Sequence, residues 1–193
     1  MRETAYAKLN LALHVRRRRE DGYHELETLF AFCEHGDVLS ASHAERDEVQ
    51  TLGEFADVVG DPGDNLVARA LSALPRPDGL TITLEKNLPV AAGLGGGSAD
   101  AGAVFRLIER VHGLPDDWQD RALKLGADVP ACVRSEMSVG RGVGEELDRP
   151  HGTVTGFLEA ALEGTNLRMI DEVEGGIVAT CGGSELAREN GSS

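Results

Sequence analysis

Three features of the sequence predict an α+β fold. Several stretches alternate apolar and polar residues with the two-residue period of a strand, and others repeat apolar residues with the period of a helix. A cluster of glycines joins one of the strands to one of the helices. The chain has 193 residues, which is enough for one large domain or two small ones and for a core that needs no disulfide or metal.

Residues 8–15 are predicted to form the first strand, because apolar and polar residues alternate along them. The buried face of this strand is expected to hold Leu9, Leu11, Leu13 and Val15. The other face is expected to hold Lys8, Asn10 and His14. Asp21 and Gly22 then predict a turn.

The remaining elements follow from the same two periods. Further strands are predicted at residues 26–32, 38–40, 80–84, 131–133 and 175–179, with a strand pair and loops in the polar stretch 43–63. Helices are predicted from Asn65 to Leu74, from Ser98 to Val111 and from a cap at Asp116 to Leu125, with two short ones at 154–162 and 167–173. Ser98 is the predicted N-cap of the second helix, because serine caps helices well.

The net charge of −14 argues against general nucleic-acid binding, because an acidic protein repels the phosphate backbone. The only basic run is Arg16–Arg19, which is interpreted as a solvated strand end; a phosphate or RNA contact is the alternative. No apolar stretch is long enough to cross a membrane, and the N-terminus lacks the apolar segment of a secretory signal. We therefore expect a cytoplasmic protein with no membrane and no nucleic-acid partner.

The number and spacing of the cysteines indicate neither a disulfide framework nor a metal site. Cys33, Cys132 and Cys181 are odd in number and far apart, and no two have the spacing of zinc ligands. This favours three small buried apolar residues in a reducing compartment over a disulfide framework.

Four glycines stand within five positions, at 93, 95, 96 and 97, between a predicted strand and a predicted helix. Glycine contributes no packing, so such a cluster indicates a backbone that bends unusually or that something approaches closely. The N-terminus of the following helix offers free N–H groups and a partial positive charge, which suit a phosphate. The spacing is neither that of a Walker A loop nor that of a dinucleotide-binding loop. From these residues alone a phosphate loop is favoured, and a tight turn is the alternative.

The loop and its surroundings resemble the GHMP small-molecule kinases. The segment Pro89-x-x-x-Gly-Leu-Gly-Gly-Gly-Ser-x-Asp100 is similar to the phosphate-binding motif of that family. Four further segments resemble the branch that acts on an alcohol carried by a cytidine diphosphate: Ala7-Lys-Leu-Asn-Leu11, Asp21-Gly-Tyr-His-Glu-Leu26, Leu125-Gly-Ala-Asp-Val-Pro130 and Gly142-Val-Gly-Glu145. The resemblance runs from residue 3 to 146. It implies a GHMP-kinase fold whose N-terminal domain is like domain 2 of ribosomal protein S5.

The activity that the resemblance implies is ATP-dependent phosphorylation of the 2-hydroxyl of 4-diphosphocytidyl-2-C-methyl-D-erythritol, in non-mevalonate isoprenoid biosynthesis. By resemblance, Asp128 is the general base and Lys8 its neighbour. An ammonium there would stabilise the carboxylate and the developing alkoxide. Taken alone, Lys8 would be a solvent-facing strand lysine and Asp128 a turn aspartate before Pro130. Ser98 is interpreted equally well as a helix cap or as a Mg²⁺ ligand.

The resemblance also assigns binding residues. It places a small-molecule cytidine diphosphate substrate at Asn10, Tyr23 and His24, where Tyr23 can stack on the cytosine and His24 can hydrogen-bond to its edge. Without the resemblance, Tyr23 and His24 would be an ordinary turn pair. ATP with Mg²⁺ is expected to contact Pro89, Val90, Ala91, Ala92, Gly93, Leu94, Gly95, Gly96, Gly97, Ser98 and Ala99, with Asn65 and Lys86 near the adenine.

The resemblance stops after residue 146. The family continues with a complete second domain that carries the motif G-S-G-A-T-C-F, of which residues 179–181 hold only Ala-Thr-Cys. We therefore expect an ATP- and substrate-binding domain at residues 1–146 and a shortened, reduced α+β segment at 147–193. Two functions are alternatives: a working kinase, or a nucleotide-binding remnant with little or no turnover. A reduced second domain also predicts exposed apolar surface and self-association, for example as a homodimer.

Overall fold

The computed structural model describes residues 1–18, 22, 24–56, 65–148, 167–173 and 176–181, the last two ranges as backbone only. The chain divides into two compact units, Met1–Arg149 and Pro150–Ser193. All the residues predicted to form a functional site lie in the first unit.

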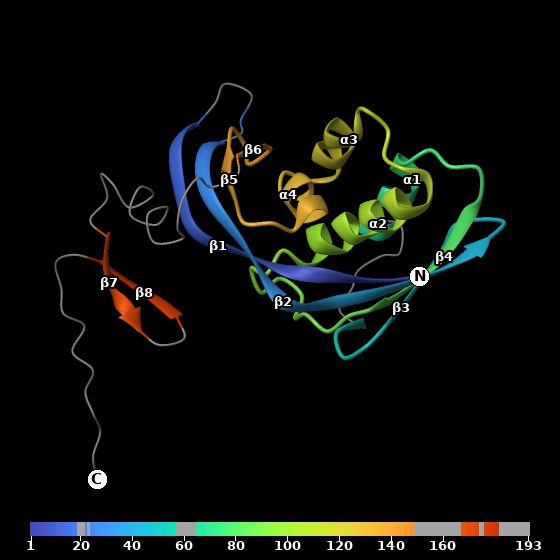
Figure 1. Ribbon diagram of the computed structural model, residues 1–193, viewed down its shortest axis with the longest axis horizontal. Helices are drawn as coiled ribbons and strands as arrows, with labels where there is room; N and C mark the ends of the chain where they lie inside the picture. Colours follow the sequence, from blue (N-terminus) through green and yellow to red (C-terminus); the bar gives the residue numbers. More distant parts are fainter. Residues whose placement is uncertain (19–21, 23, 57–64, 149–166, 174–175, 182–193) are drawn as a thin grey trace, which may run out of the picture. The chain divides into compact units, whose positions relative to one another are not determined.

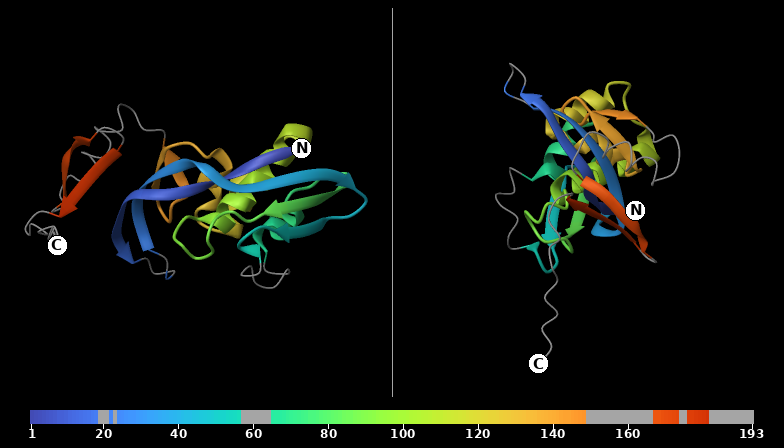
Figure 2. Two further views of the ribbon diagram at one scale, coloured as in Figure 1. Left: turned by 90° about the horizontal axis from the view of Figure 1, so that it is seen from below. Right: turned by 90° about the vertical axis from the view of Figure 1, so that its left-hand side faces the viewer.

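The first unit is built on a six-stranded sheet. Five of its strands follow the order β3-β4-β2-β5-β6, and the sixth, β1, also pairs with β2. The strands are β1 (Arg2–Arg18), β2 (His24–Ala44), β3 (Glu48–Leu52), β4 (Gly79–Glu85), β5 (Ser138–Arg141) and β6 (Glu146–Asp148). Pairing is antiparallel except between β3 and β4. Figure 2 shows that β1 and β2 form one long hairpin along this unit. This hairpin carries the amino-terminal site residues.

Figure 1 shows that the described helices of this unit cover one face of the sheet. They are α1 (Leu66–Ala73), α2 (Gly96–His112), α3 (Trp118–Leu125) and α4 (Val129–Arg134). The central helix is α2, whose buried side chains include Phe105, Leu107 and Ile108, each at most 1% exposed. A Cβ at Gly102 would lie 2.5 Å from the carbonyl carbon and oxygen of Cys132, so this glycine lets α4 pack directly on α2. That packing brings the start of α4 toward the start of α2.

The predicted burial of the first strand is wrong beyond its middle. Leu11, Leu13 and Val15 are 44%, 53% and 60% exposed, whereas Lys8 is buried. The pairing of β1 with β2 shifts register between Asn10 and Ala12, which leaves Leu11 as an extra residue. A one-residue bulge reverses which side chains face each side of a sheet, so the alternation in the sequence does not continue on one face.

Several predicted elements are confirmed with shifted bounds or changed types. The helix predicted to begin at Asn65 is α1, and Asn65 is its N-cap, through a hydrogen bond from the Val67 N–H to its side chain. The N-cap of α2 is Gly95 rather than Ser98, and that of α3 is Asp117 rather than Asp116. The structure corrects four further predictions. Residues 26–32 and 38–40 belong to one strand, β2, and the described part of 43–63 contains β3 as a separate strand. Residues 131–133 lie in α4, and residues 167–173 form a strand.

The second unit contains an antiparallel pair formed by β7 (Leu167–Val173) and β8 (Gly176–Cys181). The strand predicted at 175–179 is confirmed by β8. The helix predicted at 167–173 is wrong because short apolar patterns fit the helical and the strand period equally well. The helix predicted at 154–162 lies outside the described residues.

The basic run is a solvated strand end, as predicted, over its described part. Arg16, Arg17 and Arg18 are exposed, and cross-strand ion pairs join Arg16 to Glu27 and Arg17 to Glu25. Of the cysteines, Cys132 is buried and Cys33 half-buried. Burial raises the pKa of the Cys132 thiol to about 12, which suits a small core residue. Among the described residues, no helix is both long and apolar enough to span a bilayer.

Candidate functional site

A pocket of about 390 Å³ opens between the glycine loop, the start of α2 and the start of α1. Twelve of the thirteen residues predicted to contact ATP line it, namely Asn65, Lys86, the loop from Pro89 to Gly97, and Ser98. The exception is Ala99, which is 1% exposed and packs in the core. Leu66 and Asp100 line the pocket as well, although the sequence analysis did not select them.

The loop backbone adopts the unusual dihedrals that its glycines predict. Gly93 and Gly95 have φ values of 78° and 62°, a region that L-residues rarely enter. Ala91 has φ of 60° within the same loop, a strained conformation of the kind that clusters at ligand-binding sites. The loop ends at the N-terminus of α2, where free N–H groups and the helix dipole favour a bound anion.

Lys8 and Asp128 come together although 120 positions separate them. The Lys8 ammonium donates to Asp128 Oδ2 at 2.8 Å and to Asn10 Oδ1 at 2.7 Å. The Lys8 side chain is 5% exposed and the Asp128 side chain is 38% exposed. The pair therefore joins a buried ammonium to a carboxylate that is partly exposed to solvent. Asp128 is the N-cap residue of α4, but its side chain makes no capping hydrogen bond, and its carboxylate contacts Lys8 instead.

The glycine loop is joined directly to this ion pair. The backbone N–H of Lys8 donates to the carbonyl of Leu94 at 2.9 Å. A Cβ at Gly95 would lie 2.9 Å from Lys8 Cε, so the loop backbone rests on the lysine side chain. The loop suited to phosphate and the lysine–aspartate pair therefore form one continuous surface.

The predicted substrate residues are only partly described. Asn10 is exposed and contacts the Lys8 ammonium. His24 is exposed at the start of β2, paired with Arg18 at the far end of the hairpin. Tyr23 lies outside the described residues. The structure thus joins Asn10 to the ion pair and leaves the role of Tyr23 a prediction.

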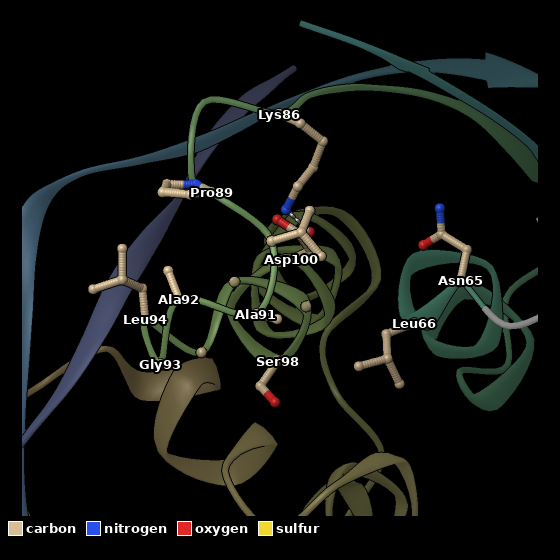
Figure 3. Close-up of a pocket in the computed structure, with 14 residues that line it drawn as sticks. Asn65, Leu66, Lys86, Pro89, Ala91, Ala92, Gly93, Leu94, Ser98 and Asp100 are labelled. Carbon is tan, nitrogen blue, oxygen red and sulfur yellow. Dashed lines mark hydrogen bonds and ion pairs between the residues drawn. The ribbon is translucent and has the colours of Figure 1, made fainter. Parts of the chain in front are cut away.

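Lys86 is engaged in a buried ion cluster beneath the loop, which sequence analysis missed. Its ammonium donates to Asp37 Oδ2. It also donates to Asp100 Oδ2 at 2.8 Å, the contact that Figure 3 shows. Burial opposes the lysine charge, but the two carboxylates outweigh it and raise the pKa of Lys86. Burial raises the pKa of Asp100 to about 7, although Lys86 opposes this shift. A Cβ at Gly96 would lie 3.5 Å from Lys86 Nζ, so this cluster supports the loop from below.

Ser98 does not cap α2 but lines the pocket, and Figure 3 shows its hydroxyl pointing away from Lys86 and Asp100. Of the two sequence interpretations, the cap is therefore wrong. The described residues contain no group of three or more metal-binding side chains.

Comparison with known proteins defines the class first. Residues 65–136 match the family model of the GHMP kinases N terminal domain, which includes α1, the loop, α2 and Asp128. The fold is also that of a mevalonate pyrophosphate decarboxylase from Streptococcus pyogenes, at 13% identity and a TM-score of 0.54 over 92% of this chain and 57% of the other. Residues 65–136 therefore match the N-terminal domain model of the GHMP kinases, and the chain shares the fold of this solved structure, as the motifs predicted.

Within that class, the chain is similar to several kinases that share one name. It is 68% identical over 155 residues to a 4-diphosphocytidyl-2-C-methyl-D-erythritol kinase of Erythrobacter litoralis, covering 80% of this chain and 57% of the relative. The enzyme of the same name from Novosphingobium aromaticivorans is 66% identical, over 77% of this chain and 52% of its own. A crystal structure of a 4-(cytidine 5'-diphospho)-2C-methyl-D-erythritol kinase is 40% identical with a TM-score of 0.64, over 79% of this chain and 56% of the other. The chain thus spans about half the length of these relatives.

Proposed function

We propose that the chain supplies the nucleotide-binding and catalytic half of a kinase that phosphorylates the 2-hydroxyl of 4-diphosphocytidyl-2-C-methyl-D-erythritol with ATP. The observation that carries this proposal is the 2.8 Å contact between Lys8 Nζ and Asp128 Oδ2, at the edge of the glycine loop. Identity of 68% and 66% to enzymes of that name supports the choice of substrate. The reaction belongs to isoprenoid biosynthesis, and a cytoplasmic location stays a prediction.

The proposed chemistry assigns each of these groups one task. Asp128 takes the proton from the substrate hydroxyl as the oxygen attacks the γ-phosphorus of ATP, and ADP leaves. Oδ2 of Asp128 already accepts from Lys8, so Oδ1 is the oxygen that takes the proton. The Lys8 ammonium has two hydrogen bonds among the described residues, which leaves its third N–H for the charge that develops during transfer.

The loop and the pocket hold the nucleotide. The N–H groups at the start of α2 face the phosphates, and Ser98 is the hydroxyl available to a Mg²⁺ ion. When bound, Mg²⁺ neutralises negative charge on the phosphates. Asn65 and Leu66 line the same pocket and are proposed to contact the adenine, whereas the Lys86 ammonium is already held by two carboxylates. Asn10, Tyr23 and His24 are proposed to bind the cytidine diphosphate.

The test is ADP release by the 193-residue chain with the cytidine substrate present. Asp128→Asn should lower kcat by about 10²- to 10⁴-fold with little change in the KM for either substrate, because it removes the base and keeps the shape. Asp120→Asn makes the same change on exposed surface of α3 and serves as the matched control. Turnover by Asp128→Asn equal to that of the control would refute the assignment.

A second candidate function is nucleotide binding with little turnover. The observation that favours it is that the chain spans about half the length of its relatives. Calorimetry with ATP and steady-state turnover, measured beside a full-length relative, separate the two candidates. ATP binding with turnover far below that of the relative supports the second, and comparable turnover supports the first. Light scattering on the same sample tests the proposed self-association.

A further inference from the structure

A chain of hydrogen bonds continues from the ion pair to a residue outside the predicted site. Lys8 Nζ donates to Asn10 Oδ1 at 2.7 Å, and Asn10 Nδ2 donates to Thr28 Oγ1 at 2.7 Å. The Thr28 hydroxyl donates in turn to the backbone carbonyl of Ala12 at 2.9 Å. Thr28 is 2% exposed, which makes it one of the few polar residues buried in this unit.

The direction of each bond in this chain is fixed from both ends. The Lys8 ammonium can only donate, so the atom of Asn10 that faces it must be the carbonyl oxygen. The Ala12 carbonyl can only accept, so the Thr28 hydroxyl donates its one proton to that carbonyl. The hydroxyl oxygen is then an acceptor for Asn10. Only an N–H group can donate to this oxygen, so the atom of Asn10 that faces Thr28 is the amide nitrogen. Thr28 therefore sets the same orientation of the Asn10 carboxamide that Lys8 requires.

The conformation of Thr28 is itself fixed by its neighbours. Thr28 pairs with Leu13 in β1 and with Gly140 in β5, so a strand lies on each side of it. A Cβ at Gly140 would lie 3.1 Å from the Thr28 methyl carbon, so the methyl group fills the space that this glycine leaves in β5. With the methyl on that side, the hydroxyl points toward β1, where the register shift presents the carbonyl of Ala12.

We propose that Thr28 is a positioning residue for the Lys8–Asp128 pair, acting through Asn10; this rests on the proposed function of that pair. Without the Thr28 hydroxyl, the Asn10 carboxamide is held by the Lys8 ammonium alone instead of from both ends. Asn10 is then placed less firmly, which weakens one of the two bonds that hold the Lys8 charge beside Asp128. In the orientation that Thr28 imposes, Asn10 keeps one N–H for a substrate.

The first arm of the test reads the carboxamide directly and needs no turnover. The side-chain amide signals of Asn10 in the NMR spectrum of the 193-residue chain are assigned by their loss in Asn10→Ala. Thr28→Val keeps the shape of Thr28 and removes the hydroxyl, whereas Thr28→Ser keeps the hydroxyl. We expect the bonded amide proton of Asn10 to shift and to exchange faster with water in Thr28→Val, and to be restored in Thr28→Ser. If Thr28→Val fails to fold, Thr28→Ala takes its place. Identical Asn10 signals in all the folded variants would overturn the proposal.

The second arm is a double-mutant cycle on turnover. Thr28→Val should lower kcat/KM for the cytidine substrate about 3- to 10-fold, the range that one neutral hydrogen bond corresponds to, and leave the KM for ATP unchanged. In the Asn10→Ala background the same substitution should cause no further loss, because Thr28 acts only through Asn10. An equal loss in both backgrounds would show a purely structural role and overturn the proposal. If the wild-type chain has no turnover, the proposed function fails, and the NMR arm alone decides the role of Thr28.

Discussion

Replacing Gly95 by alanine tests whether the loop and the lysine act as one unit. The new Cβ would stand 2.9 Å from Lys8 Cε and 3.2 Å from Lys8 Cβ, closer than carbon atoms tolerate. The lysine side chain must therefore shift, which disturbs its 2.8 Å contact with Asp128. A hydrogen bond between charged groups contributes about 1.5–3 kcal/mol, which corresponds to a loss of about 10- to 150-fold in kcat. The φ of 62° at Gly95 adds about 1–2 kcal/mol of backbone strain for any L-residue.

A variant at a second glycine separates the effect of backbone strain from the effect of the contact with Lys8. Gly113 ends α2 with φ of 75°, and a Cβ there meets nothing within 4 Å. With ψ of 172°, Gly113 lies in a region that essentially only glycine adopts, so Gly113→Ala should lose about 1–3 kcal/mol in the free energy of unfolding by urea and keep its turnover. Gly95→Ala should also lose stability and, at saturating ATP, should have a lower kcat as well. The reasoning is refuted if the two variants, compared under conditions where both are folded, have equal kcat.

Three further predictions concern other parts of the molecule. Tyr23→Ala should cost about 1–3 kcal/mol of cytidine-nucleotide binding in calorimetry, the usual contribution of one base stack, and leave ATP binding unchanged; equal losses would make Tyr23 structural. Burial raises the pKa of Asp100 from 3.8 to about 7, so its contribution to stability is complete below about pH 4 and is lost as the pH rises through 7. Asp100→Asn should remove that dependence, so the free energy of unfolding of wild type minus that of the variant should be smaller at pH 8 than at pH 5; a constant difference contradicts the shift. Leu13 is 53% exposed on β1. If the protein self-associates through the apolar face of β1, Leu13→Lys should reduce self-association in light scattering, and unchanged association would show that another surface is responsible.

The local parts of the site could be predicted from the sequence because they depend on neighbours along the chain. The glycine cluster implies unusual dihedrals, and Gly93 and Gly95 have them. The helix pattern that follows places free N–H groups at the loop, and α2 begins at Gly96. The pairing of Lys8 with Asp128 followed only from the resemblance, since 120 positions separate the two residues. No period or composition connects residues that far apart.

The parts that could not be predicted depend on register and on burial. The alternation from Leu9 to Val15 looked like a single buried face, but one extra residue at Leu11 reversed it. The resemblance placed Lys86 near the adenine, and Lys86 does line the pocket. The structure shows that Asp37, from a different strand, and Asp100 already hold its ammonium. Two acids and one base buried together leave no pattern in the sequence, because the three come from β2, from the segment after β4 and from α2.

Three glycines outside any turn explain how the distant segments meet. Gly95 lies against Lys8 of β1, Gly102 against the backbone of Cys132 in α4, and Gly140 against Phe30 and Thr28 of β2. Each admits a segment that a methyl group would exclude, and together they bring the loop, the ammonium and Asp128 to one place. Phe30 connects two of these contacts, because its ring packs on Gly140 and lies 5.0 Å from the Lys8 ammonium. The sequence shows each glycine but not its partner, so the site becomes visible only when the chain is folded.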